Sequence, residues 1–138
     1  MKSEWKWLFV ACLVAVFATT GALFLGEVMG MMPCTLCWYQ RIVMFPLALI
    51  LSVACYSDDR CGADYGLWLA VTGLLISGYH TLLVAGLVSP SWLPCGAGPS
   101  CAQQRLDIFD GIQIPWLSLA AFALISLSLL IYLKKTSK

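Results

Sequence analysis

Four long apolar stretches, separated by short polar segments, dominate the chain. About 20 apolar residues in a helix cover a hydrocarbon core of about 30 Å, so each stretch predicts a membrane-spanning helix. We place these spans at about residues 7–26, 36–57, 65–88 and 112–133. The predicted fold is therefore an all-α membrane protein, an up-and-down four-helix transmembrane bundle that forms a single domain over residues 1–138.

The first stretch also has some features of a secretory signal peptide, because Lys2 and Lys6 precede it. Its uncharged run from Trp7 to Gly26 exceeds the usual apolar region of about 7 to 15 residues, and no A-x-A-like cleavage site closes it. We therefore expect this segment to be retained as the first span.

The second span needs residues before Arg41 to cross the bilayer, so its helix is expected to begin near Pro33. Pro46 lies inside it and should kink it, a defect that neighbouring helices accommodate in a membrane. A polar turn over residues 58–64 then precedes the third span, and a loop rich in Pro and Gly occupies residues 89–111. The helices are expected to pack through small residues, such as Gly73, Ser77 and Gly78.

Composition supports a membrane protein, since 61% of the residues are hydrophobic and 11% are charged, against about 25% charged residues in soluble domains. The net charge of +1, without a basic patch, argues against a nucleic-acid partner.

The basic residues also predict the orientation. Lysines flank the first and last spans, at positions 2, 6, 134, 135 and 138. By the positive-inside rule both termini are cytoplasmic, and the segments 27–37 and 89–111 are extracytoplasmic. Arg105 is the one basic residue of those segments that departs from the rule.

Four of the seven cysteines fall in the segments expected outside the cytoplasm, as two pairs. Cys34 and Cys37 form a C-x-x-C at the start of the second helix, where backbone N–H groups stabilise a thiolate and can lower the thiol pKa. Cys95 and Cys101 lie in the Pro/Gly-rich loop, which can fold back so that their sulfurs meet. Two dithiols on one face could exchange electrons, so we take all four as catalytic candidates.

Two structural alternatives remain for these pairs. They could be independent structural disulfides, or the C-x-x-C could bind a metal. A closed zinc site needs four ligands, and we expect no histidine near this pair, so no metal residue is assigned. The other three cysteines, Cys12, Cys55 and Cys61, are interpreted as buried small hydrophobes or reduced thiols.

Arg41 and His80 are the polar residues of the spans with most chemical potential. Arg41 follows Cys34 and Cys37 on one helix face and could stabilise a Cys37 thiolate or charge on an acceptor; alternatively it reaches the headgroups or pairs with Glu27. His80 is expected in the same leaflet, as a proton relay or as a helix-packing residue. A lipid-soluble quinone beside Cys37 and Arg41 would serve as the electron acceptor.

Four segments together resemble the DsbB family of disulfide bond formation proteins, especially its short-loop BdbC-like members. They are P-C-T-L-C-W-Y-Q-R at 33–41, Y-H-T at 79–81, P-C-G-A-G-P-S-C at 94–101 and D-G-I-Q-I-P-W at 110–116. The resemblance covers nearly the whole chain, and a C-x-x-C followed by arginine is specific within four-span proteins.

The resemblance implies a quinone-dependent thiol oxidase that reoxidises a DsbA-like (BdbD-like) thioredoxin-fold protein and passes the electrons to menaquinone or ubiquinone. Cys95 would form the mixed disulfide with that partner, and Cys101 would exchange with Cys34. Cys37, beside Arg41, would reduce the quinone, with His80 near the ring.

The chain departs from the family pattern at two places. Gln40 stands where some members have an acid, and the loop around the second cysteine pair is short, with Leu106 where longer-loop members have a tryptophan. These departures affect the expected quinone and partner contacts more than the cysteine roles. Two other functions stay open: a quinone reductase resembling the vitamin K epoxide reductase family, and a small membrane protein that handles soft metals through C-x-x-C.

Overall fold

The computed structural model describes residues 3–89 and 113–137, and it contains the four expected helices. Helix α1 spans Trp5–Leu23 and continues into a wider π-helical turn, η1, at Phe24–Val28. Helices α2, α3 and α4 span Thr35–Ser57, Arg60–Val84 and Ile114–Thr136. All four are long and apolar enough to cross a membrane, with 23 to 25 residues each when η1 is counted with α1.

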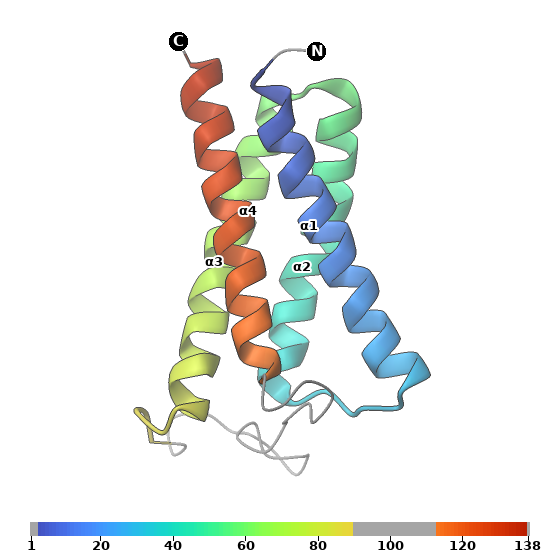
Figure 1. The fold of residues 1–138 in the computed structure, drawn as a ribbon, viewed down its shortest axis with the longest axis vertical. Coiled ribbons are helices and arrows are strands. Elements are labelled where there is room, and N and C mark those ends of the chain that lie inside the picture. The colour runs from blue at the N-terminus through green and yellow to red at the C-terminus, as the bar shows by residue number, and fades with distance from the viewer. Residues whose placement is uncertain (1–2, 90–112, 138) are drawn as a thin grey trace.

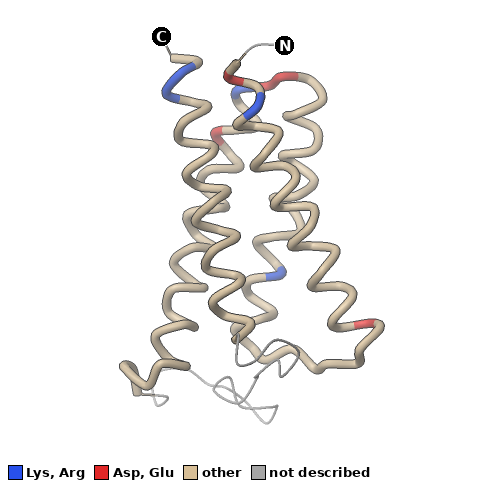
Figure 2. Tube along the Cα trace, in the orientation of Figure 1, with Lys and Arg blue, Asp and Glu red and all other residues tan. Residues whose placement is uncertain are grey.

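The helices run up and down, and both termini lie at one end of the bundle (Figure 1). Each helix packs against the next along the chain, and α1 also packs against α4. The N-terminus of α2 lies at the opposite end, which we call the dithiol end because it carries Cys34 and Cys37. Figure 2 shows that the charged residues gather mainly at the end with the termini.

Small residues let the helices approach closely, as predicted. A Cβ atom added at Gly73 would lie 2.0 Å from Cε1 of the buried Phe122 in α4. A Cβ at Gly66 would lie 2.8 Å from Leu51 Cδ2 in α2. Ser77 is fully buried in the same helix. Helix α3 therefore presents small residues to both of its neighbours, a common means of packing helices in lipid.

The polar turn before α3 is shorter than the sequence indicated. Helix α3 begins at Arg60, so most of the segment 58–64 is helical. The reason is an N-cap: the Asp59 carboxylate accepts hydrogen bonds from the backbone N–H groups of Cys61 and Gly62, both at 3.0 Å. Asp58 adopts a left-handed conformation (φ 50°) and turns the chain. Helix α2 runs through Pro46, and the kink expected there stays a prediction.

Candidate active site

The C-x-x-C pair sits where an extended segment enters α2. Cys34 is the N-cap residue, with φ −71° and ψ 169°, and its sulfur accepts a hydrogen bond from the Cys37 backbone N–H at 3.4 Å. This local geometry brings the Sγ atoms of Cys34 and Cys37 to 3.0 Å from each other, without a disulfide between them. Small side-chain rotations would bring the two sulfurs together to form a disulfide. The S–S bond in a disulfide is about 2.05 Å long.

The two thiols are not electrostatically equivalent. The hydrogen bond to Cys37 and burial of the side chain raise the pKa of Cys34, which immediately precedes the spanning helix, to about 12. The expectation of a lowered pKa at this position is therefore wrong for Cys34. The helix N-terminus favours a thiolate, but a thiol that donates its proton to a neighbouring sulfur and is 2% exposed resists ionisation. In the reduced pair, Cys34 keeps the proton.

His80 lies beside this pair, in α3. Its ring is completely buried, and its Nε2 atom is 3.9 Å from Cys34 Sγ. The expectation that no histidine lies near the C-x-x-C is wrong. Helix α3 packs against α2 so that His80 lies at the level of the first turn of α2. The Sγ atoms of both cysteines and a ring nitrogen of His80 lie within 4.8 Å of one another, a spacing that could hold a metal ion.

Gln40 holds the other side of the His80 ring. Its amide Nε2 lies 3.1 Å from His80 Nδ1. If that amide donates to Nδ1, the proton is on Nε2 and His80 can donate to Cys34. With the amide turned over, Nδ1 carries the proton and Nε2 can accept one from Cys34. Sequence analysis noted Gln40 only as a departure from the family pattern, although it lies on the same helix face as Cys37.

Arg41 points toward α1 at the irregular turn. Its Nη2 atom donates to the Ala22 carbonyl at 2.9 Å, and its guanidinium lies 5.8 Å from the centre of the Trp38 ring. Gly26 gives it room, since a Cβ atom there would lie 3.1 Å from both terminal nitrogens. Within residues 3–89 and 113–137, Arg41 makes no ion pair with Glu27. In the described part of the chain, the guanidinium is therefore held by a carbonyl and an aromatic face.

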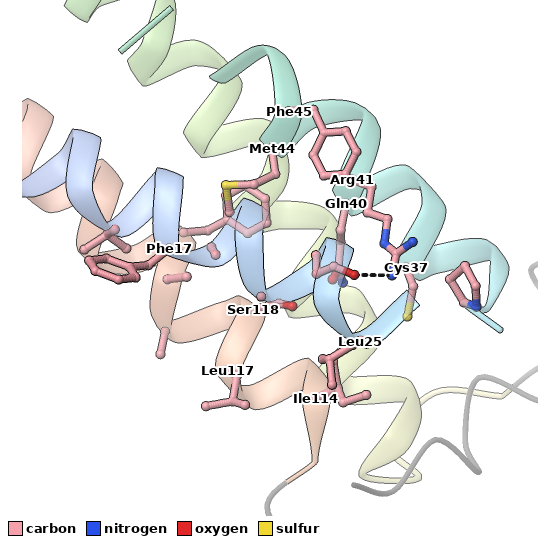
Figure 3. Close-up of a pocket in the computed structure, with 18 of the residues that line it drawn as sticks. Phe17, Leu25, Cys37, Gln40, Arg41, Met44, Phe45, Ile114, Leu117 and Ser118 are labelled. Atoms are coloured by element: carbon pink, nitrogen blue, oxygen red, sulfur yellow. Dashed lines mark hydrogen bonds between the residues drawn. The ribbon is translucent and has the colours of Figure 1, made fainter. Parts of the chain in front are cut away.

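A cavity of about 530 Å³ opens between α1, α2 and α4, next to the dithiol. Cys37, Gln40 and Arg41 contribute polar atoms to one part of it, and apolar side chains make most of the rest (Figure 3). Among these apolar residues are Phe17, Leu25, Met44, Phe45 and Leu117. Cys37 and Arg41 thus share the cavity, as their i, i+4 spacing predicted. His80 is not among the lining residues; it contacts Cys34 and Gln40 behind the cavity wall.

The remaining cysteines are placed as follows. Cys95 and Cys101 lie outside the described residues. Cys12 in α1 is half-buried, Cys55 in the last turn of α2 is buried, and Cys61 in the first turn of α3 is exposed. None of these three is in a disulfide within the described part of the chain.

Residues 4–132 match the family model described as "Disulfide bond formation protein DsbB". The chain belongs to the DsbB family. A "Probable disulfide formation protein" of Metapseudomonas resinovorans is 45% identical over 134 residues, which cover 96% of this chain and 93% of that protein. "Disulfide bond formation protein C" of Bacillus subtilis (strain 168) is 39% identical over 125 residues, 91% of each chain.

Family membership and the four apolar helices define the molecule at a coarse level. It is a multi-pass membrane protein of disulfide bond formation, with disulfide oxidoreductase activity. This family assignment favours disulfide formation over the two other functions that the sequence left open.

Proposed function

We propose that this protein reoxidises an extracytoplasmic DsbA-like (BdbD-like) thioredoxin-fold protein and passes the electrons to a membrane quinone. The observation that carries the proposal is the position of Cys37 and Arg41 in the wall of an apolar cavity that adjoins the C-x-x-C dithiol. A structural disulfide needs neither the cavity nor the cation.

The cavity fits a quinone in size and in chemistry. Its volume of about 530 Å³ is in the usual range of about 300–1,000 Å³ for small-molecule sites. Its walls are mostly apolar, which suits a lipid-soluble ring. Arg41 and Gln40 would hold the ring oxygens, and Cys37 would face the ring. The chemistry that a bound quinone supplies is the uptake of two electrons and two protons.

The chain's own residues then perform two kinds of step. In the first, the partner dithiol attacks the Cys95–Cys101 disulfide; one S–S bond forms in the partner as one breaks here, and no electrons leave the sulfurs. Cys101 then attacks Cys34 of the Cys34–Cys37 disulfide. The Cys95–Cys101 disulfide forms again as the Cys34–Cys37 disulfide breaks, which leaves Cys34 and Cys37 as the reduced pair. In the second, Cys34 and Cys37 lose two electrons and two protons and close their disulfide. His80, next to Cys34, is the residue placed to accept the Cys34 proton.

We place the dithiol end outside the cytoplasm and both termini inside, in the bacterial cytoplasmic membrane. The support is the charge distribution: Lys6, Lys134 and Lys135 lie near the termini, where Arg60 also begins α3. This orientation satisfies the positive-inside rule. It also exposes the active cysteines to the oxidising compartment, where disulfides persist.

The direct test uses the purified full-length chain in lipid discs, with a reduced DsbA-like protein and either ubiquinone or menaquinone. Loss of partner thiols and loss of quinone absorbance should proceed together, at one dithiol per quinone. Cys37→Ala should abolish both, whereas Cys61→Ser, at the far end of the bundle, should change neither. Failure of well-folded protein to consume thiols with both quinones would reject the proposal.

The order of exchange has its own test. Replacing Cys101 by Ala should trap Cys95 in a mixed disulfide with the partner, detectable as a reductant-sensitive adduct. If the partner is trapped on Cys34 or Cys37 instead, the roles assigned to the two pairs are reversed.

A further inference from the structure

The dithiol and the neighbouring histidine together also form a set of metal-ligand side chains. Three side chains from two helices converge: Cys34 and Cys37 from the start of α2, and His80 from α3. Their donor atoms lie within 4.8 Å of one another. Two thiolates and one imidazole are a common protein ligand set for zinc, which accepts Cys₂His with a fourth position left for water.

We propose that the reduced form of this protein binds Zn²⁺ through Cys34, Cys37 and His80. In a tetrahedral site with Zn–S of about 2.3 Å and Zn–N of about 2.05 Å, the two sulfurs would lie about 3.8 Å apart and sulfur and nitrogen about 3.6 Å apart. The two sulfurs lie 3.0 Å apart here, and Cys34 Sγ lies 3.9 Å from His80 Nε2. Side-chain adjustments of less than 1 Å at these pairs therefore approach the required geometry.

Charge favours a divalent cation at this place. Binding replaces two thiol protons by one Zn²⁺, so the site of two thiolates, a neutral imidazole and the ion has no net charge. Cys34 is 2% exposed and His80 is completely buried, and an uncompensated charge there would be costly. A monovalent cation such as Cu⁺ would leave the buried site with one negative charge, which makes it the less suitable occupant.

Gln40 supplies the support that metal-binding histidines usually have. Such histidines donate their second ring N–H to a fixed acceptor, which orients the ring and selects the tautomer. Gln40 lies 3.1 Å from His80 Nδ1. With the amide oxygen turned to that nitrogen, Nδ1–H donates to Gln40 and the Nε2 lone pair faces Cys34 and the ion.

The consequence is a redox-dependent block of the enzyme, a regulation that rests on the proposed function. Zn²⁺ binds only when both sulfurs are thiolates, so the disulfide form cannot bind it at this site. A bound ion would hold the dithiol reduced, because neither sulfur could then attack or close a disulfide. Binding itself requires no quinone or partner.

Binding is tested on the full-length protein, reduced with a phosphine, desalted and titrated with Zn²⁺ against a chromogenic chelator. We expect a site of one ion per chain that is absent after oxidation and is lost in Cys34→Ser and Cys37→Ser. His80→Gln should weaken it, and Gln40→Leu should weaken it by about 10- to 100-fold, as outer-shell changes do. Cys61→Ser and a Cys95→Ala/Cys101→Ala variant are the matched controls and should retain it.

Zinc K-edge absorption of the wild-type complex adds a readout that does not depend on variant folding. Two sulfur ligands with one imidazole would support the site. Four sulfur ligands, a site lost only when Cys95 and Cys101 are replaced, or an affinity unchanged by His80→Gln would each overturn it.

Oxidase assays separate this site from the proposed function. Zn²⁺ should inhibit the partner's oxidation, and a chelator should restore it. If the protein does not oxidise the partner in the presence of a chelator, but binds Zn²⁺ in the titration, the oxidase proposal is rejected and the zinc site stands. If the protein oxidises the partner fully in chelator but does not bind Zn²⁺ through Cys34, Cys37 and His80, the zinc site is rejected and the oxidase proposal stands.

Discussion

The close approach of α3 to α4 at Gly73 predicts a large response to one added methyl group. In Gly73→Ala, the new Cβ would lie 2.0 Å from Phe122 Cε1 and 2.4 Å from Cζ. Carbon atoms prefer a separation of at least about 3.5 Å, so α3 and α4 must part by about 1.5 Å or the ring must move. The ring is 1% exposed, and the space next to it is the cavity that it lines, so it can move only toward that side.

The expected cost follows from two opposing effects. Overpacking a buried site costs about 1–3 kcal/mol, and the overlap of about 1.5 Å places this site at the upper end, because it requires a helix shift or a ring displacement into the cavity. Alanine regains about 1 kcal/mol of helix propensity over glycine. We therefore expect Gly73→Ala to lower the free energy of unfolding by about 2 kcal/mol. Because Phe122 also lines the cavity, quinone affinity should fall as well.

Reversible unfolding in mixed micelles, followed by helical circular dichroism, measures this change. Gly21→Ala is the matched control, because no atom lies within 4 Å of its added Cβ; it should be neutral or stabilising. Adding Phe122→Leu to Gly73→Ala should recover part of the loss, a positive coupling in a double-mutant cycle. If Gly73→Ala is as stable as Gly21→Ala, the described packing of α3 on α4 is incorrect.

Three further substitutions test other parts of the molecule. Arg41→Met removes a charged hydrogen-bond donor from the cavity and should raise the KM for quinone about tenfold or more, while thiol exchange with the partner is unchanged; an unaltered KM would support an arginine that only anchors α2 at the headgroups. Gly26→Ala should raise that KM a few-fold without loss of stability, because the new Cβ displaces the guanidinium by a few tenths of an ångström; Gly78→Ala is the control, because its Cβ would lie 4.0 Å from Leu119 Cδ1 and it does not line the cavity. Asp59→Ala removes the cap of α3 and should cost about 1 kcal/mol in the same unfolding assay, with quinone kinetics intact; a loss of activity would contradict a purely structural cap.

The fold was predictable because lipid restricts a spanning chain to few structures. Backbone groups in the hydrocarbon core must be paired within the segment, so four apolar stretches of adequate length imply four helices. The start of α3 was less predictable. Charged residues at 60 and 64 suggested a turn, whereas the Asp59 cap allows the helix to begin among them. A single capping carboxylate outweighed the apparent polarity of the segment.

The part of the site that lies on one helix was also predictable. Cys37 and Arg41 are four residues apart, so a helix places both on one face and in one cavity. The contacts of His80 with Cys34 and Gln40 join residues 46 and 40 positions apart. They depend on how α3 is aligned along α2, and that alignment follows from the fit of small residues such as Gly66 against Leu51. Residue spacing alone carries no information about it.

The site divides its two thiols between different surroundings, and this division argues against interchangeable roles. Cys34 faces a buried imidazole and keeps its proton, whereas Cys37 opens on an apolar cavity that also holds a guanidinium. Under the proposed function, the sulfur that shares the cavity with Arg41 is the one that reduces the quinone, so this role belongs to Cys37. In the same proposal Cys34 exchanges with an incoming thiol, and His80 Nε2, 3.9 Å from its sulfur, is the group placed to take its proton. Gln40 touches both surroundings, since it lines the cavity and contacts His80. One amide side chain therefore joins the imidazole beside Cys34 to the wall of the cavity that Cys37 lines.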